Sequence, residues 1–110
     1  MNGLKIAIDW KVKEVNGQRS IQLFDENGNK ISGGESRWEG GFYCSYNQLT
    51  SLEGAPKEVG GYFSCDNNKL TSLEGAPKEV GGDFYCDNNK LTSLEGAPKE
   101  VGGYFFWSTF

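Results

Sequence analysis

The sequence has no histidine, little positive charge and no long apolar run. Without histidine it lacks the side chain that most often serves as a general acid or base near neutral pH. Its 11 basic and 15 acidic residues give a net charge of −4, which disfavours binding to a nucleic-acid backbone. No apolar stretch reaches the length of a membrane span, and the N-terminus shows no charged-then-apolar signal pattern. We therefore expect a cytoplasmic protein that binds neither nucleic acid nor membrane.

The usual motifs of catalysis and cofactor binding are also missing. The sequence holds no Ser-His or Cys-His pair and no phosphate-binding loop that opens a helix. The acidic and amide residues between Asp25 and Asn29 resemble the opening of a calcium loop. The glycine comes too early, however, and Ser36 stands at the twelfth place, where an acid is needed. We interpret this segment as a plain turn and expect no enzyme activity, no cofactor and no metal.

Cysteine is scarce and regularly placed. Cys44, Cys65 and Cys86 are 21 residues apart, and Trp107 occupies the next step. We interpret the three thiols as small apolar side chains that stack in the core, one in each repeat. Neighbouring coils lie close enough for a disulfide, but the odd number of cysteines argues against one. A metal or redox role is the alternative.

What the sequence does contain is a strict repeat. The thirteen residues LTSLEGAPKEVGG occur three times without a change, at 49–61, 70–82 and 91–103. Self-similarity at a fixed period in this range is typical of a solenoid. One unit alone cannot bury its apolar face, so the stacking of units creates the core.

The third copy illustrates how one unit is expected to fold. Phe84 and Cys86 alternate with outward positions, and this period of two predicts a short strand. Asn89 follows where the chain leaves the strand, and a buried amide there can bond backbone groups of its own turn and of its neighbour. Leu91 and Leu94 then face inward again. Glycine and proline interrupt the return path, which is too broken for an α-helix.

The residues of this unit carry a family resemblance. The pattern F-x-C-x-x-N-x-L-x-x-L resembles the core of leucine-rich repeats, with Phe and Cys in place of the strand leucines. The segment NKLTSLEGAP is similar to the short-repeat subclass found in bacterial effectors and in small bacteriophage proteins. The resemblance covers residues 38–110 and implies a mostly β, leucine-rich-repeat-type solenoid with short parallel strands. One extra residue at the Gly-Gly step suggests a bulge ahead of each strand.

Residues 1–37 do not share the period, and we predict that they form a β-hairpin cap. The first stretch alternates in polarity, and its apolar positions are Leu4, Ile6, Ile8, Trp10 and Val12. Asn16-Gly17 is a hairpin-type turn, and a second strand follows around Ile21. Such a cap would cover the open end and free strand edge of the first coil. Residues 38–110 then form a solenoid of about 3.5 repeats of 21 residues.

The outward strand positions vary, whereas the return path is constant. The variable positions carry mainly aromatic and acidic side chains: Tyr43, Tyr62, Ser64, Asp66, Asp83, Tyr85, Asp87, Tyr104 and Phe106. Tyrosine gives a large contact area at a small entropic cost, so we expect this strand face to bind a protein partner. The alternative is that the aromatic pairs only stabilise the sheet.

Aromatic side chains also gather around the last strand: Phe105, Phe106, Trp107 and Phe110. No polar capping unit follows them, although the terminal coil of a solenoid normally needs one. We expect a homodimer that buries this edge through the C-terminal coil. Cover by another partner, or by the aromatics folding back over their own coil, is the alternative.

Taken together, these features predict a non-enzymatic protein-binding module. The resemblance to bacteriophage repeat proteins implies a small accessory protein in the cytoplasm of a bacterial host, where it would inhibit a host defence factor. One alternative is a ligand binder whose stacked aromatics hold a nucleotide or a sugar. Another is a structural protein that only associates with itself.

Overall fold

The structure is a computed structural model that describes residues 3–108, and short β-strands make up its regular elements. One 3-10 turn, η1 (Gly33–Glu35), lies between β4 and β5. The strands, in chain order, are β1 (Lys5–Ile6), β2 (Asp9–Val15), β3 (Gln18–Phe24), β4 (Lys30–Ile31), β5 (Ser36–Trp38), β6 (Phe42–Tyr43), β7 (Glu58–Val59), β8 (Phe63–Ser64), β9 (Glu79–Val80), β10 (Phe84–Tyr85), β11 (Glu100–Val101) and β12 (Phe105–Phe106).

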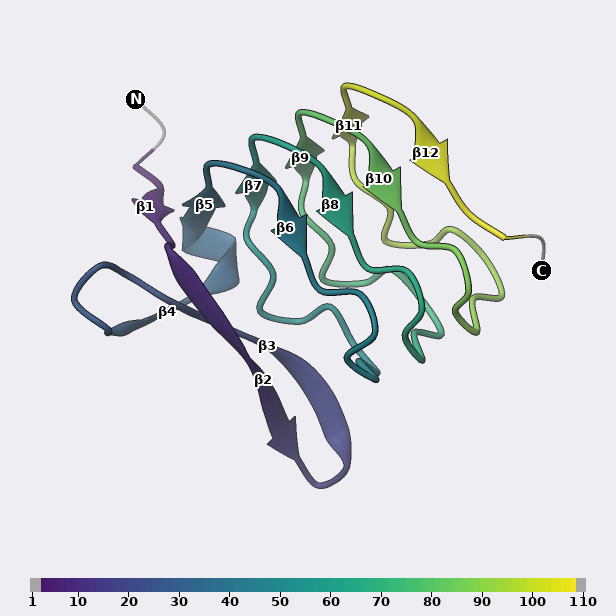
Figure 1. Cartoon of the computed structure of the whole chain (residues 1–110), viewed down its shortest axis with the longest axis horizontal. Coiled ribbons are helices and arrows are strands. Elements are labelled where there is room, and N and C mark those ends of the chain that lie inside the picture. The colour runs from purple at the N-terminus through teal and green to yellow at the C-terminus, as the bar shows by residue number, and fades with distance from the viewer. Residues whose placement is uncertain (1–2, 109–110) are drawn as a thin grey trace.

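The repeats wind into a solenoid that has two parallel sheets. The first sheet has the order β1-β5-β7-β9-β11, and the second has the order β12-β10-β8-β6. Each coil gives one strand to each sheet, and the strands of successive coils lie side by side (Figure 1). The prediction of a mostly β solenoid with short parallel strands is therefore confirmed.

The Gly-Gly step of each unit is a corner between the two sheets. Strand partners are one full repeat apart both before and after this step, as Val59 and Val80 are, so no coil has a residue inserted relative to the next. Neighbouring coils therefore show no bulge relative to one another, and the Gly-Gly step turns the chain from one sheet into the other; an extra residue that every coil shares would leave this register unchanged. A Cβ on Gly81 would collide with the carbonyl oxygen of Gly60, so the corners stack only with glycine there.

The core consists of columns that run along the solenoid. The rings of Phe42, Phe63 and Phe84 stack nearly parallel, with 5.5 Å between the centroids of successive rings. The thiols form a second column, and the leucines that were predicted to face inward form a third and a fourth. The members of these other columns that are fully buried are Cys44, Cys65, Cys86, Leu49, Leu52, Leu70 and Leu73. The predicted inward positions are thus confirmed for these coils.

The predicted asparagine column is also present. Asn68 is buried, and its side-chain amide donates hydrogen bonds to the carbonyl oxygens of Cys65 in its own coil and Cys44 in the preceding coil, both at 3.0 Å. Asn89 bonds in the same way to Cys86 and Cys65. Each amide therefore links two coils where the chain leaves the second sheet.

The N-terminal hairpin occupies the place that a preceding coil would take, as Figure 1 shows, and forms an antiparallel sheet with the order β2-β3-β4. The N–H of Ile21 in β3 donates to the carbonyl oxygen of Glu53 at 3.0 Å, and the N–H of Thr50 donates to that of Arg19 at 2.9 Å. A Cβ on Gly54 would collide with the carbonyl oxygen of Ile21, so the two segments are in close contact. The hairpin cap is confirmed.

The first apolar stretch does not form the single strand that its alternation predicts. Ile6 and Ile8 are 42% and 57% exposed, whereas Ala7 between them is only 2% exposed. The N–H of Ala7 donates to the carbonyl oxygen of Arg37 in the solenoid, and the N–H of Ile8 donates to that of Phe24 in the hairpin. The chain therefore passes from one sheet to another at this point, and the alternation changes phase.

Strand β1 joins the cap to the solenoid. It pairs in parallel with β5, with Lys5 opposite Ser36, so the first strand of the chain extends the first sheet. The predicted boundary between the cap (1–37) and the solenoid (38–110) falls inside β5. Among residues 3–108, the structure contains no helix whose length and apolar character would let it cross a membrane.

Candidate interaction face

The outer face of the second sheet carries the residues that were predicted to bind a partner. The register of the coils places these outward positions in three columns. The first column precedes the strands (Gly41, Tyr62, Asp83, Tyr104), the second lies within them (Tyr43, Ser64, Tyr85, Phe106), and the third follows them (Ser45, Asp66, Asp87, Ser108).

Most of the aromatic side chains in these columns are open to solvent. Tyr43, Tyr62 and Tyr104 are 61%, 47% and 74% exposed. Ser64 differs from the expectation, because it is only 8% exposed. It lies between Tyr43 and Tyr85 in the register, and these larger neighbours shield its small side chain. Ser64 therefore offers little surface to a partner.

Four of the aromatic rings form one connected group, which we call the aromatic cluster: Tyr62, Tyr85, Tyr104 and Phe106. The rings of Tyr85 and Phe106 are parallel within 1°, and their centroids are 4.7 Å apart. Tyr62 meets Tyr85 edge-on at 6.1 Å, and Tyr104 meets Phe106 at 6.0 Å. Tyr43 lies apart from this cluster, because Ser64 separates it from Tyr85 in the register.

Two of the acidic side chains on the face are held by the chain itself. Asp66 accepts hydrogen bonds from the hydroxyl of Ser45 at 2.6 Å and from the amide of Asn67 at 2.8 Å. Asp83 accepts one from the N–H of Tyr104 at 2.8 Å and one from the hydroxyl of Tyr85 at 2.9 Å. The hydrogen bond to Asp83 raises the pKa of the Tyr85 phenol, so both acids help to fix the face.

The cysteine column has the environment of a structural core. Cys44, Cys65 and Cys86 are free and buried, as predicted. Burial raises the pKa of all three thiols, to about 12 for Cys86, so they remain protonated and unreactive at neutral pH. Within residues 3–108, no three cysteine or acidic side chains lie close enough together to hold a metal ion.

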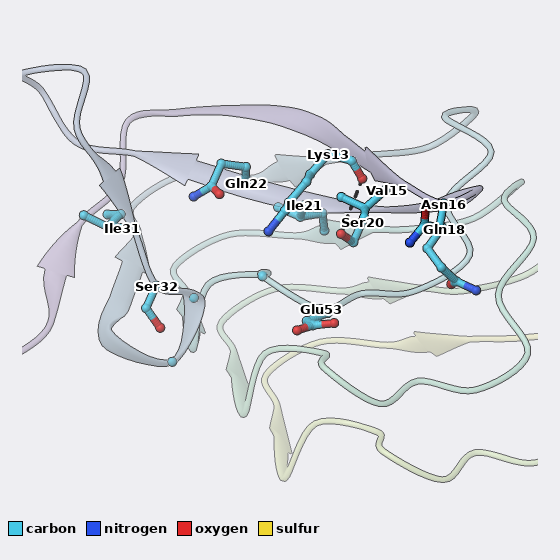
Figure 2. A pocket seen from close by; sticks show the side chains of 13 residues that line it. Lys13, Val15, Asn16, Gln18, Ser20, Ile21, Gln22, Ile31, Ser32 and Glu53 are labelled. Carbon is cyan, nitrogen blue, oxygen red and sulfur yellow. Dashed lines mark hydrogen bonds between the residues drawn. The ribbon is translucent and has the colours of Figure 1, made fainter.

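A groove between the hairpin and the first coil was not anticipated from the sequence. It has a volume of about 630 Å³ and is lined by β2, β3, the segment 31–34 and Glu53-Gly54. In Figure 2, Lys13 and Val15 lie along the hairpin, and Glu53 lies across from them. No local pattern marks the groove, because segments distant in the sequence form it. Its mixed lining favours no particular chemistry.

The last coil is less well covered than the coils before it. Leu91, Leu94, Ala97, Val101 and Phe105 are only half-buried, although the equivalent side chains one coil earlier are buried. Of the residues predicted to mediate self-association, Phe105 packs on Phe84 at 4.9 Å, Phe106 belongs to the strand face and Trp107 is 44% exposed. Phe110, the fourth, lies outside the described residues.

Comparisons of the chain with models of protein families, with curated proteins and with solved structures found no match. The case for a function therefore depends on the geometry of the face and on the sequence resemblance of the repeat.

Proposed function

We propose that the protein is a non-enzymatic binding module that holds a protein partner on the outer face of its second sheet. The observation that carries this proposal is the aromatic cluster, in which Tyr62, Tyr104 and Phe106 are exposed and Tyr85 links Tyr62 to Phe106. Exposed aromatic groups that lie together mark interaction sites more often than plain surface. Tyrosine is also among the side chains that dominate binding energy at protein interfaces.

The first sheet provides an internal contrast that supports this proposal. From β5 onwards its outward positions are charged (Arg37, Glu58, Glu79 and Glu100), and only the first position, Ile6 of β1, is apolar. Arg37 pairs with Glu58 at 3.0 Å, and repulsion from Glu58 raises the pKa of the exposed Glu79. This column is typical of solvated surface. The aromatic character is thus specific to the second sheet and is not a product of repetition.

We further propose that the solenoid is of the leucine-rich-repeat type, on the resemblance of F-x-C-x-x-N-x-L-x-x-L to that family. The Phe, Cys and Asn positions of the pattern each form a column in this chain. The same resemblance supports an accessory protein of a bacteriophage that acts on a defence factor in the host cytoplasm. The partner is therefore sought in a bacterial lysate.

A capture experiment with matched variants tests the strand face. The immobilised wild type is compared with Tyr62→Ala combined with Tyr85→Ala, and with Tyr46→Asn as the control. Tyr46 is 77% exposed but lies after the strand, at a left-handed position that Asn67 and Asn88 occupy in the later coils. We expect the wild type and the control to retain the same protein, and the double variant to lose it.

The outcome separates the binding classes. A protein that all three baits retain equally would contradict the strand-face proposal. If no protein is retained, but nucleotides or sugars raise the melting temperature of the wild type and not of the double variant, the small-ligand alternative is correct. Circular dichroism of the double variant confirms that its fold is intact.

The half-buried last coil favours self-association as a second function. A stack of coils can grow only where a core face is open, and the hairpin already covers the N-terminal end. Two copies that meet by continuing the stack would meet through their C-terminal coils, and this contact would be two-fold symmetric and close on itself. We propose a homodimer in which Leu94, Val101 and Phe105 become buried.

A further inference from the structure

Among the three acidic side chains of the strand face, Asp87 has different surroundings from Asp66 and Asp83. The carboxylates of Asp66 and Asp83 each accept two hydrogen bonds from within the chain. The Asp87 carboxylate has no hydrogen-bond or ion-pair partner within residues 3–108, although the residue is half-buried. Its oxygens are open to solvent, because the described residues contain no buried side-chain oxygen without a partner, so the carboxylate can bond a group from outside the chain.

Asp87 lines a hollow at the end of the strand face. The hollow has a volume of about 460 Å³, and its other lining residues are Tyr85, Phe105, Phe106 and Trp107. The rings of Tyr85 and Phe106 stack face to face, so each covers one face of the other and the pair presents its edges and its outer faces to the surroundings. Phe106 and Trp107 are 41% and 44% exposed, so a ligand can reach these rings from solvent. The hollow thus combines one carboxylate with several ring faces and edges.

This combination fits an organic cation better than other ligands. None of the outward positions in the three columns of the face carries lysine or arginine, so no cation of these columns competes for the carboxylate. A divalent metal ion needs several oxygen ligands, and the hollow offers one carboxylate. A sugar or a neutral base would stack on the rings but would form no ion pair with Asp87. A cation satisfies both features, because ring faces attract positive charge.

We propose that this hollow receives an arginine side chain of the protein partner, which rests on the proposed function of the strand face. A guanidinium group is planar, so it can stack against Phe106 or Trp107 while its edge donates two hydrogen bonds to Asp87. An ammonium group is a more strongly hydrated point charge and makes no planar stack. The hollow therefore selects arginine over lysine, and the partner presents an exposed arginine to the last two strands.

A short peptide tests this site without knowledge of the partner. The probe is the blocked tripeptide acetyl-Gly-Arg-Gly-amide, titrated into the ¹⁵N-labelled full chain at low salt. The control peptides carry citrulline, which has nearly the same shape without the charge, or lysine. We expect the indole N–H signal of Trp107 to shift with the arginine peptide. The signals of Trp10 and Trp38, which pack against the core, should not move.

The dissociation constants separate the contribution of the Asp87 charge from that of the ring contacts. One side chain should bind with a dissociation constant of roughly a millimolar. We expect Asp87→Asn to weaken this binding roughly tenfold, because the charge-assisted hydrogen bonds are lost. The matched control is Asp66→Asn, one coil earlier in the same column, and it should change binding by less than about twofold. The citrulline peptide should bind at least about tenfold more weakly than the arginine peptide.

Several results would overturn the assignment. If the Trp107 signal does not move, or moves equally with citrulline, the hollow is no guanidinium site. The same holds if Asp87→Asn binds as the wild type does. These failures would leave the strand-face proposal standing, because that proposal depends on Tyr62 and Tyr85 in the capture experiment. The opposite result is also informative. If the double variant captures the partner as well as the wild type does, while the arginine peptide still shifts the Trp107 signal, the guanidinium site stands and the wider strand-face proposal is wrong.

Discussion

The side-chain oxygen of Asn68 accepts a hydrogen bond from the backbone N–H of Leu49, in the preceding coil, at 2.9 Å. The same oxygen accepts a second bond from the N–H of Asn47 at 3.0 Å. Asn89 repeats the relationship with Leu70, again at 2.9 Å. The asparagine column therefore supplies hydrogen bonds between coils at a point where the strands have ended, and this explains why the units stack in one register.

Replacement of Asn68 by alanine should be strongly destabilising. It leaves two backbone N–H groups and several carbonyl oxygens without their partner, and we expect a loss of about 3 kcal/mol in the free energy of unfolding. Asn67→Gly is the control, because Asn67 has a φ of 55° that glycine adopts freely. Urea denaturation measures both. Equal losses in the two variants would contradict the register of the column.

The Gly-Gly corners make a second prediction about stability. An alanine at Gly81 would clash with the backbone of Gly60, so we expect Gly81→Ala to cost about 2–3 kcal/mol. Gly40→Ala is the control: it lies at the second position of the corner in the first coil, where a Cβ meets nothing within 4 Å. Its effect should stay below about 0.5 kcal/mol. Thermal melts of both variants test the close approach, and similar melting temperatures would show that the corners do not stack so tightly.

The buried thiols should make the fold sensitive to alkaline pH. A thiol ionises near pH 8.5 in an unfolded chain, whereas burial raises the pKa of Cys86 to about 12 in the folded chain. The unfolded state thus loses this proton first as the pH rises. The contribution of the thiol to stability is full below about pH 8.5 and declines from there towards pH 12, by up to ~1.4 kcal/mol per pH unit.

Cys86→Ala isolates this contribution. The variant should lose stability less steeply between pH 9 and 10 than the wild type does, when both are measured by urea denaturation. All three cysteines should also react slowly with a thiol reagent until the protein unfolds, because they are buried. Identical slopes, or rapid labelling of the native protein, would contradict a structural role for this column.

Self-association through the last coil predicts a specific change in mass. Leu94→Glu places a charge on a half-buried side chain of the open end, and we expect it to convert the dimer into a monomer in light scattering at micromolar concentration. Val15→Glu, on the exposed side of the hairpin, is the control and should remain a dimer. A monomeric wild type excludes the dimer. If Val15→Glu is monomeric and Leu94→Glu remains a dimer, the contact lies on the hairpin.

The repeat predicted the parts of the fold that depend on strict spacing. The Phe, Cys and Asn columns follow from the period of 21 residues, because residues one period apart take the same place in successive coils. The strands of the first sheet were missed because Glu and Val are followed at once by the Gly-Gly corner, whereas the alternation of Phe and Cys extends beyond the strands of the second sheet. The phase change at Ala7 was missed because a single alternating stretch pairs with two different sheets.

The candidate site was predicted in its position but not in its detail. Period and register placed the tyrosines outward; Tyr43, Tyr62 and Tyr104 are exposed, and Tyr85 is half-buried. The sequence did not reveal that Ser64 is shielded by its neighbours, because shielding depends on side chains one coil away. It also did not separate Asp87 from Asp66, which are both aspartates of the same column. The neighbour one coil earlier differs, because Ser45 donates a hydrogen bond to Asp66, whereas Asp66 itself occupies that place for Asp87.

The most direct test of the strand face is a calorimetric titration of the captured partner with three chains. Tyr62→Ala should weaken binding by roughly thirtyfold or more, because a central tyrosine in an interface contributes at least about 2 kcal/mol. Tyr46→Asn should bind within about twofold of the wild type, since Tyr46 lies off the face. If Tyr62→Ala binds as tightly as the wild type, or if Tyr46→Asn alone loses the partner, the second sheet is not the binding surface.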